Sequence, residues 1–251
     1  MSAALFDLTG RTALVTGSTR GLGFAIARAL GAAGARVAIN GRTSAAVDGC
    51  VAALGSEGLD VVSAPFDVTD EAAVAAGIEG LGPVEVLVNN AGMTMRKTLE
   101  DWSLEEWQRI FAVNVTSVFL VSRAVVPAMI ERGRGKIVNV CSVQSELARQ
   151  TIAPYTATKG ALKNLTKAMC ADWARHGIQV NGIGPGYFDT ELTRALQDDP
   201  EFDTWLRARV PAGRWGDPTD LAGTAVFLAS AASDFVNGQV IYVDGGLTAV
   251  V

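Results

Sequence analysis

The chain reads Thr16-Gly17-Ser18-Thr19-Arg20-Gly21-Leu22-Gly23 directly after a short β-branched run, and an apolar, alanine-rich segment follows. Glycines let the backbone approach a pyrophosphate closely, while the first amides of a following helix present donors and a partial positive charge to the anion. A glycine cluster alone equally marks an ordinary turn, but a strand before it and a helix after it predict a dinucleotide-binding loop. The expected contacts are Gly17, Ser18, Thr19, Arg20, Gly21, Leu22 and Gly23.

Short β-branched runs alternate with helix-period stretches along the whole chain. Parallel neighbours need long connections, and each connecting helix must bury its apolar stripe. The pattern therefore predicts a doubly wound α/β Rossmann fold: a single seven-stranded parallel sheet with helices on both faces. The expected strands are Thr12–Thr16, Arg36–Asn40, Asp60–Ala64, Val84–Asn89, Lys136–Cys141, Gln179–Ile183 and Gln239–Val243.

Helix boundaries carry local signals. Ser103-Leu104-Glu105-Glu106 is a capping box that opens a long apolar-periodic run to Arg132, and Asp217-Pro218 opens another helix. The sequence shows no linker-like tract and no repeat of solenoid period, which predicts one domain over residues 1–251. Residues 187–215, from Tyr187 to Trp215, show no strand pattern and are expected to form an irregular substrate lid.

Composition excludes several classes of protein. The 251 residues carry 21 Lys and Arg against 26 Asp and Glu, a formal charge of −5 that argues against a nucleic-acid partner. No stretch approaches about 18 uninterrupted apolar residues, and the start lacks a basic segment followed by an apolar one, so we expect a cytoplasmic protein without a membrane partner. Three cysteines without C-x-x-C spacing suggest neither a disulfide framework nor a thiolate metal cage.

His176 is the only histidine, so a His-rich zinc site or a Ser-His-Asp hydrolase would depend on it alone. It lies in Arg175-His176-Gly177, a pattern typical of a helix end with cations in the last turn and glycine just beyond. We therefore expect a capping role for His176 and no metal site.

The second expected strand ends in Asn40-Gly41-Arg42, where dinucleotide-binding folds commonly place an acidic residue that binds the adenosine ribose. With no carboxylate to repel a 2′-phosphate, and with Arg42 and Arg20 able to form charge-assisted bonds to one, NADP(H) is favoured over NAD(H). The alternative is that Arg42 is a solvated loop residue.

The other strand ends are also polar. Asp67 follows the third strand, Asn89-Asn90-Ala91-Gly92 ends the fourth, Ser142 ends the fifth and Pro185-Gly186 follows the sixth. The carboxyl ends of parallel strands face one side, where the ligand crevice of an open α/β sheet lies. Each residue separately could be turn chemistry, but together they predict one cleft.

Tyr155 and Lys159 are four residues apart at the start of the expected helix Tyr155–His176 and share one face. A free tyrosine has a pKa of about 10, and lowering it by 2 to 3 units requires roughly 2.7 to 4 kcal/mol of preferential phenolate stabilisation. An adjacent ammonium and a cofactor cation could supply that energy. A tyrosine and a lysine at this spacing commonly lie on a helix surface without a catalytic role. The hydroxyl of Ser142, which could hold a substrate oxygen beside the phenol, favours proton transfer.

These elements together resemble the short-chain dehydrogenase/reductase family from Thr16 to Gly246: T-G-x-x-x-G-x-G, N-N-A-G, the serine and Y-x-x-x-K occur in order. The resemblance implies that Tyr155 is the general acid/base, that Lys159 lowers its pKa and binds the nicotinamide ribose, and that Ser142 orients the carbonyl. It implies a homotetramer built on the two long helices and the last strand. The further positions it implies are Asn114 in a proton relay, Asp67 and Val68 at the adenine, Asn90, Ala91 and Gly92 at the adjoining ribose and turn, and Pro185, Gly186, Phe188 and Thr190 near the nicotinamide.

A narrower similarity involves residues 141–149, 184–188 and 211–216, which resemble family members that interconvert 5-keto-D-gluconate and D-gluconate. A sugar acid has a carboxylate, and arginine's planar fork suits one, although surface solvation is the alternative for each arginine. The expected substrate residues are Arg96, Ser142, Gln144 and Arg149. Two other functions stay open: reduction of another carbonyl, such as a 3-oxoacyl thioester or a polyol-related ketone, and a non-catalytic NADPH-binding sensor.

Overall fold

The computed structural model describes residues 2–251, and one parallel sheet organises them. The strand order is β3-β2-β1-β4-β5-β6-β7, so the chain reverses its direction of winding between β1 and β4. All seven expected strands form, with bounds that differ from expectation by no more than two residues, which confirms the doubly wound fold. The strands are β1 (Thr12–Val15), β2 (Arg36–Gly41), β3 (Val61–Pro65), β4 (Val86–Asn89), β5 (Gly135–Val140), β6 (Ile178–Pro185) and β7 (Val240–Val243).

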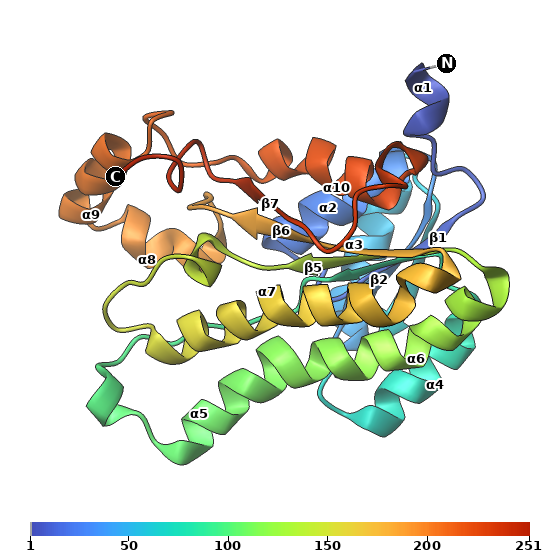
Figure 1. Ribbon diagram of the computed structural model, residues 1–251, viewed down its shortest axis with the longest axis horizontal. Helices are drawn as coiled ribbons and strands as arrows, with labels where there is room; N and C mark the ends of the chain where they lie inside the picture. Colours follow the sequence, from blue (N-terminus) through green and yellow to red (C-terminus); the bar gives the residue numbers. More distant parts are fainter. Residues whose placement is uncertain (1) are drawn as a thin grey trace.

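Helices cover both faces of the sheet because successive strand residues point to opposite sides. In β1, Ala13 and Val15 pack with one layer, whereas Leu14 packs with the other. One layer holds α2 (Gly21–Ala32), α3 (Ser44–Ser56) and α10 (Ala222–Ala229), and the other holds α4 (Glu71–Leu81), α6 (Ser117–Arg132) and α7 (Ala153–Trp173), as Figure 1 shows. The remaining α-helices are α1 (Ser2–Leu5), α5 (Leu104–Phe111), α8 (Arg194–Gln197) and α9 (Pro200–Arg209).

Short helical turns join these elements. The π-helical turn η2 (Ala112–Thr116) lies between α5 and α6, and the 3₁₀ turns are η1 (Leu99–Asp101), η3 (Val143–Ser145), η4 (Ala174–His176), η5 (Glu191–Thr193), η6 (Pro218–Leu221) and η7 (Ala231–Ser233). His176 ends η4 immediately before the left-handed Gly177 (φ 72°), as its capping interpretation requires.

The capping box at Ser103 is confirmed. The Ser103 hydroxyl accepts a hydrogen bond from the Glu106 amide, and the Glu106 carboxylate accepts one from the Ser103 amide, both at 3.1 Å. The helix expected from here to Arg132 forms as one helical run, Leu104–Arg132, in which the π-helical turn η2 separates α5 from α6. Tertiary hydrogen bonds of Asn114, described below, account for the division.

The helical run Leu104–Arg132 has the length and composition of a membrane-spanning helix, with a mean hydropathy of 1.7, and 44% of that apolar stretch is buried. Val118, Val121, Val125 and Met129 from this run pack against the sheet. A core helix passes the same test of length and composition, and the buried face of α6 accounts for the apolar content here.

Residues 187–215 lie beyond the carboxyl end of β6, at the left of Figure 1. The expectation that this segment is irregular is wrong: it contains η5, α8 and α9, and the Asp199 side chain caps α9 by accepting hydrogen bonds from two backbone amides. Its apolar side chains form a third core with the turn after β5 and the chain end. The buried members are Val143, Leu196, Leu206, Val210, Trp215 and Leu247.

Candidate active site

The glycine-rich loop lies between the ends of β1 and β4, where the sheet reverses its winding, and Asn90 holds it there. The Asn90 side-chain amide donates to the carbonyls of Thr16 (2.9 Å) and Gly17 (3.0 Å). In return the Thr16 hydroxyl accepts from the amides of Asn90 and Ala91, both at 3.0 Å. Asn90 is therefore occupied with shaping the loop.

Two glycines in this loop have no room for a side chain. A Cβ on Gly17 would lie 2.9 Å from the Cα of Ala91, and one on Gly23 would lie 2.4 Å from the Asn90 side-chain nitrogen and 2.5 Å from the Gly17 carbonyl oxygen. Arg20, at the N-cap of α2, has no acceptor in its side chain, so the first-turn amides of α2 have no side-chain cap in the described chain. A cradle of this shape with uncapped helix amides fits the pyrophosphate of a dinucleotide.

Asn40 and Ser18 support the loop from inside. The Asn40 side chain accepts from the Gly17 amide (3.1 Å) and donates to the carbonyls of Ala64 (2.9 Å) and Phe66 (3.1 Å), so its carboxamide is internal. Ser18 is fully buried, and its hydroxyl donates to the Val15 carbonyl at 2.7 Å. Both residues position the backbone, and their side chains do not face the crevice.

The two arginines expected at a 2′-phosphate, Arg42 and Arg20, differ in their ion pairs. Arg42 is exposed and forms no ion pair within residues 2–251, and its charge contributes to lowering the pKa of Asp67, after the hydrogen bonds from Thr69. Arg20 instead pairs with Glu191 in the segment 187–215 at 3.0 Å, with both side chains more than two-thirds exposed. Arg42 is thus the cation that a phosphate would meet without displacing a carboxylate.

Ser142, Tyr155 and Lys159 meet at the carboxyl end of β5. Ser142 caps η3 by accepting from the Gln144 amide at 3.1 Å. Lys159, one turn after Tyr155 on α7, is buried, and its ammonium donates to the Val140 carbonyl at 2.6 Å. The ammonium lies 5.6 Å from the centre of the Tyr155 ring, over its face.

Burial sets the pKa directions of Tyr155 and Lys159 in the protein without cofactor. Burial raises the pKa of Tyr155, and Ser142 lowers it only in part. The lowered pKa expected from the sequence includes the charge of a bound cofactor and stays a prediction. Burial also lowers the pKa of Lys159 to about 8. Because the ammonium is bonded to a backbone carbonyl and faces the ring, the protein alone favours a neutral phenol.

Asn114 explains the π-helical turn η2. Its side chain accepts from the Met93 amide (2.8 Å) and donates to the Met93 carbonyl (2.9 Å) and to the Thr158 hydroxyl (3.1 Å). These bonds join the segment after β4 to α7 and bring Gly92 close to Lys159, whose ammonium lies 3.9 Å from the place of a Gly92 Cβ. The relay residue expected from the family pattern therefore lies beside the tyrosine–lysine pair, with its carboxamide engaged.

Two of the expected substrate residues, Arg96 and Arg149, lie near one another. Burial and the Arg149 charge together lower the pKa of Arg96. The Arg149 guanidinium lies 5.0 Å above the centre of the Phe202 ring on α9. Gln144 is 7% exposed, and its side-chain oxygen has no hydrogen-bond partner in the described residues.

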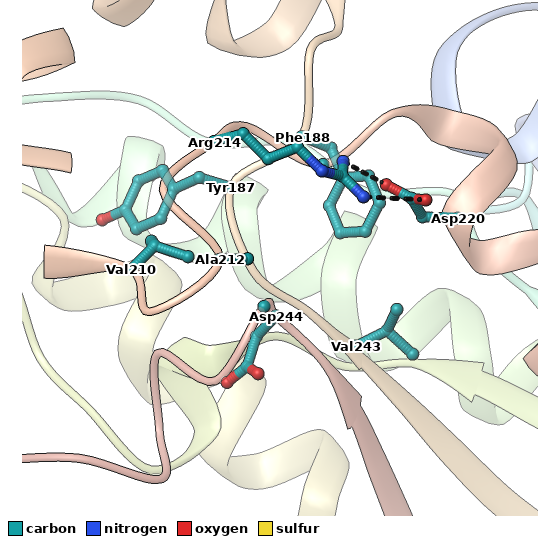
Figure 2. A pocket seen from close by; sticks show the side chains of 10 residues that line it. Tyr187, Phe188, Val210, Ala212, Arg214, Asp220, Val243 and Asp244 are labelled. Atoms are coloured by element: carbon teal, nitrogen blue, oxygen red, sulfur yellow. Dashed lines mark hydrogen bonds and ion pairs between the residues drawn. The ribbon is translucent and has the colours of Figure 1, made fainter. Parts of the chain in front are cut away.

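The start of the segment 187–215 returns to the glycine-rich loop. Thr190 lies 3.9 Å from the place of a Gly21 Cβ, and Phe188 is buried against Gly216. A cavity of about 270 Å³ lies on this side. Figure 2 shows Phe188, Tyr187 and the Arg214–Asp220 ion pair among the residues that line it. Among the described residues that line the cavity there is none from the group Ser142, Tyr155 and Lys159.

Residues 17–248 match a family profile described as enoyl-(acyl carrier protein) reductase. The chain is 54% identical to gluconate 5-dehydrogenase of Gluconobacter oxydans (strain 621H), with 97% of each chain covered. It is 51% identical to 5-keto-D-gluconate 5-reductase of Escherichia coli (strain K12), covering 98% of this chain and 99% of that one. The chain belongs to the short-chain dehydrogenase/reductase family.

A solved member of this family is a gluconate 5-dehydrogenase from Burkholderia cenocepacia J2315 in complex with NADP and tartrate. It superposes with a TM-score of 0.98 and 53% identity over 100% of both chains. The resemblance to short-chain dehydrogenases, and within them to the gluconate group, is confirmed by these similarities.

The remaining expected cofactor positions lie at or just after the carboxyl ends of the strands β1, β2, β3, β4 and β6. Gly186 donates its amide to the Val243 carbonyl at 3.0 Å directly after Pro185 ends β6, and Val68 is buried beside Asp67. The neighbours in the glycine-rich loop, the second strand and the fourth strand that complete the set are Thr19, Gly21, Leu22, Gly41, Ala91 and Gly92.

Sequence reasoning assigned no role to Tyr187, although the structure brings it to the arginine pair. Burial raises the pKa of Tyr187, while the charge of Arg149, a hydrogen bond with it and the charge of Arg96 lower that pKa. Tyr155 also acts on this pKa, so Tyr187 lies near both the phenol and the arginines. Its position one residue after Pro185-Gly186, at the end of β6, was a signal that could have identified it.

Proposed function

We propose that this protein is an NADP(H)-dependent oxidoreductase that interconverts 5-keto-D-gluconate and D-gluconate. The observation that carries the proposal is the group at the end of β5, where the buried Lys159 ammonium lies 5.6 Å from the centre of the Tyr155 ring. Arg96 and Arg149 lie near enough to Tyr187 for their charges to act on its pKa. The relatives named for gluconate and 5-keto-D-gluconate support the same substrate.

Bound NADP(H) supplies hydride transfer to or from the substrate carbon. The α2 amides would hold the pyrophosphate and Arg42 the 2′-phosphate, which favours NADP(H) over NAD(H). Lys159 would hold the nicotinamide ribose, while Asp67 and Val68 would border the adenine. Phe188 and Thr190, carried by the start of the lid, would close over the nicotinamide.

In carbonyl reduction, Tyr155 donates its phenolic proton to the substrate oxygen, and in the reverse reaction the phenolate removes the hydroxyl proton. Ser142 holds that oxygen by a hydrogen bond, which stabilises the charge that develops on it. The raised pKa of Tyr155 keeps the proton donor neutral in the protein alone, as reduction requires. Asn114 fixes the segment at Met93 against α7. In the family pattern, Asn114 would take part in the proton relay that leads from Tyr155.

The substrate carboxylate would bind between Arg96 and Arg149, since two close guanidinium groups are stabilised by an anion between them. Gln144, whose buried side-chain oxygen has no partner in the described residues, would accept a hydrogen bond from a substrate hydroxyl. A neutral ketose would leave the arginine pair without its counter-charge, so the site favours sugar acids.

The domain organisation, the location and the oligomeric state are also proposals. We infer one domain over residues 1–251, a substrate lid over about 187–215, a cytoplasmic location and a homotetramer without nucleic-acid or membrane partners. Exposed Leu104, Phe119 and Ile130 on the α5–α6 helices support self-association. Light scattering at micromolar concentration tests the tetramer, and a monomer would contradict it.

One assay tests the proposed reaction. We expect purified protein to consume NADPH with 5-keto-D-gluconate faster than with 2-keto-D-gluconate or a short 3-oxoacyl thioester. The Michaelis constant should be lower for NADPH than for NADH. Preference for the thioester would overturn the substrate, preference for NADH would overturn the role of Arg42, and inactivity with the whole panel would favour a non-catalytic sensor.

A further inference from the structure

A carboxylate anchors the far end of the turn that carries Ser142. Glu146 accepts a hydrogen bond from the Tyr242 hydroxyl at 2.8 Å and an ion pair from the Lys163 ammonium, both on the same oxygen. Tyr242 lies on β7, and Lys163 lies on α7 one turn beyond Lys159. One partly exposed side chain therefore ties the turn to two separate elements.

The same turn is joined to the catalytic helix at a second point. The Ser145 hydroxyl donates to the Lys159 carbonyl at 2.9 Å, while Ser142 accepts from the Gln144 amide within the turn. Val143, between them, is buried in the core of the lid. The distance between the Ser142 hydroxyl and the Tyr155 phenol thus depends on how this turn is seated on α7.

We propose that Glu146 is a positioning residue that, through Lys163 and Tyr242, holds the Ser142 turn against α7 and so keeps the Ser142 hydroxyl in place beside the Tyr155 phenol. The inference rests on the proposed role of Tyr155 as acid/base. Exposed ion pairs contribute little to folding stability, so a contribution from this one should be visible in the geometry of the site more than in the stability of the fold.

Two possible roles of Glu146 predict opposite changes in the pKa of Tyr155 when Glu146 is removed. The groups facing the phenol are Ser142, Cys141, Lys159 and Tyr187, with Arg96 and Arg149 beyond, and those facing Glu146 are Lys163, Lys167 and Tyr242. If Glu146 acted only as a negative charge, its removal would favour the phenolate and lower the pKa of Tyr155. If it holds the Ser142 turn, its removal weakens a hydrogen bond to the phenolate, and that pKa rises.

The test compares Glu146→Ala, Glu146→Gln and Tyr242→Phe with the parent enzyme in D-gluconate oxidation by NADP⁺ across pH. Because oxidation requires the phenolate, the rate rises with pH. We expect Glu146→Ala to lower kcat about tenfold, since small misplacements of catalytic groups have large effects. KM should stay within about twofold, and the rising limb should move upward by about half a pH unit.

The conservative variants sharpen this result. Glu146→Gln keeps an oxygen acceptor for Tyr242 and Lys163, so its kcat should stay within about threefold of the parent, and Tyr242→Phe should lie between the two variants. Glu57→Ala, which removes an exposed ion pair with Arg28 at 2.6 Å, is the matched control and should behave like the parent.

Several results would overturn the proposal. They are an unchanged kcat in Glu146→Ala, a rising limb displaced to lower pH, or a loss of activity that follows a loss of NADPH affinity and thermal stability. If the parent oxidises a different hydroxy substrate, the proposed substrate is wrong, and the pH comparison on that substrate still decides the role of Glu146.

Discussion

The crevice around the glycine-rich loop and the region around Ser142, Tyr155 and the lid use polar groups in different ways. In the crevice, the side chains of four residues form hydrogen bonds with backbone groups: Thr16, Ser18, Asn40 and Asn90. In the substrate region, polar groups are left over. Five buried side-chain polar atoms of the described residues lack a partner, and those of Thr94, Gln144 and Thr156 lie within two residues of a candidate site residue.

Backbone strain and repulsion between like charges are also found in the substrate region. Thr151, just before α7, has φ 69° and is the only non-glycine residue with positive φ in the described chain. Arg96 and Arg149 lie close enough for their charges to oppose one another. A β-branched residue in this conformation and unpaired buried oxygens are costly to the fold, and they commonly mark functional sites. In the crevice, side chains bonded to the main chain fix the shape of the loop. In the substrate region, polar side chains lack partners and are available to hydrogen-bond a ligand.

Replacing Tyr155 by phenylalanine should separate the two regions most sharply. We expect kcat to fall about a thousandfold, because the phenol that donates the proton is removed, and general acid–base catalysis contributes about 10² to 10⁴. The dissociation constant for NADPH, measured by fluorescence titration, should change by no more than about twofold. Turnover close to the parent rate would remove Tyr155 from the reaction.

The strands and the cofactor crevice could be predicted from the sequence because their signals are local. Buried parallel strands appear as continuous apolar runs, and β4 and β5 are buried at every residue. The glycines of residues 17–23 lie where a strand gives way to a helix, so their role follows from order along the chain. Neither inference needs knowledge of which distant residues meet.

The rest depended on tertiary contacts. The π-helical turn at Asn114 results from bonds to Met93 and Thr158, which lie 21 and 44 residues away. Arg149 meets Phe202, and Glu146 meets Tyr242, only after the lid and β7 have folded. The lid helix α9 was the exception, since Asp199-Pro200 is a local capping signal that could have predicted it.

Gly23→Ala should damage the crevice and leave the substrate region intact. The new Cβ would meet the Gly17 carbonyl oxygen and the Asn90 side chain, and the backbone atom has no room to move. We expect the free energy of unfolding to fall by about 1 to 3 kcal/mol and the NADPH dissociation constant to rise about tenfold or more. Urea unfolding and fluorescence titration measure these changes.

Gly49→Ala is the matched control for that substitution. Gly49 lies on α3 with no atom within 4 Å of the place of its Cβ. An alanine there should stabilise the helix by roughly 0.5 to 1 kcal/mol and leave NADPH binding unchanged. Equal behaviour of the two variants would contradict the close-packed cradle.

Arg149→Ala should act only on the substrate region. Losing one guanidinium from a carboxylate site should raise KM for 5-keto-D-gluconate about tenfold, in line with the contribution of charged hydrogen bonds. KM for NADPH should be unaffected. Arg207→Ala, on the exposed Asp203–Arg207 ion pair of α9, should leave both constants unchanged. If KM for the sugar acid survives in Arg149→Ala, the carboxylate binds elsewhere.

Lys159 lies where the two regions meet, and its effect on stability should depend on pH. Burial lowers its pKa to about 8 in the folded protein, against about 10.4 for an ordinary lysine. Between those values the unfolded chain binds more protons, so this residue makes the free energy of unfolding rise with pH, by at most about 3 kcal/mol. Below pH 8 both states carry the charge, and the cost of burying it is fully present.

Lys159→Met should remove that rise, as measured by urea unfolding of the cofactor-free protein from pH 7.5 to 10.5. Lys167→Met, on the exposed side of the same helix, should keep the parent's slope. A difference between parent and Lys159→Met that stays constant over this range would mean that the bond to the Val140 carbonyl fully compensates burial. In that case the ammonium would belong to the permanently satisfied crevice, and the boundary between the two regions would lie at Tyr155 itself.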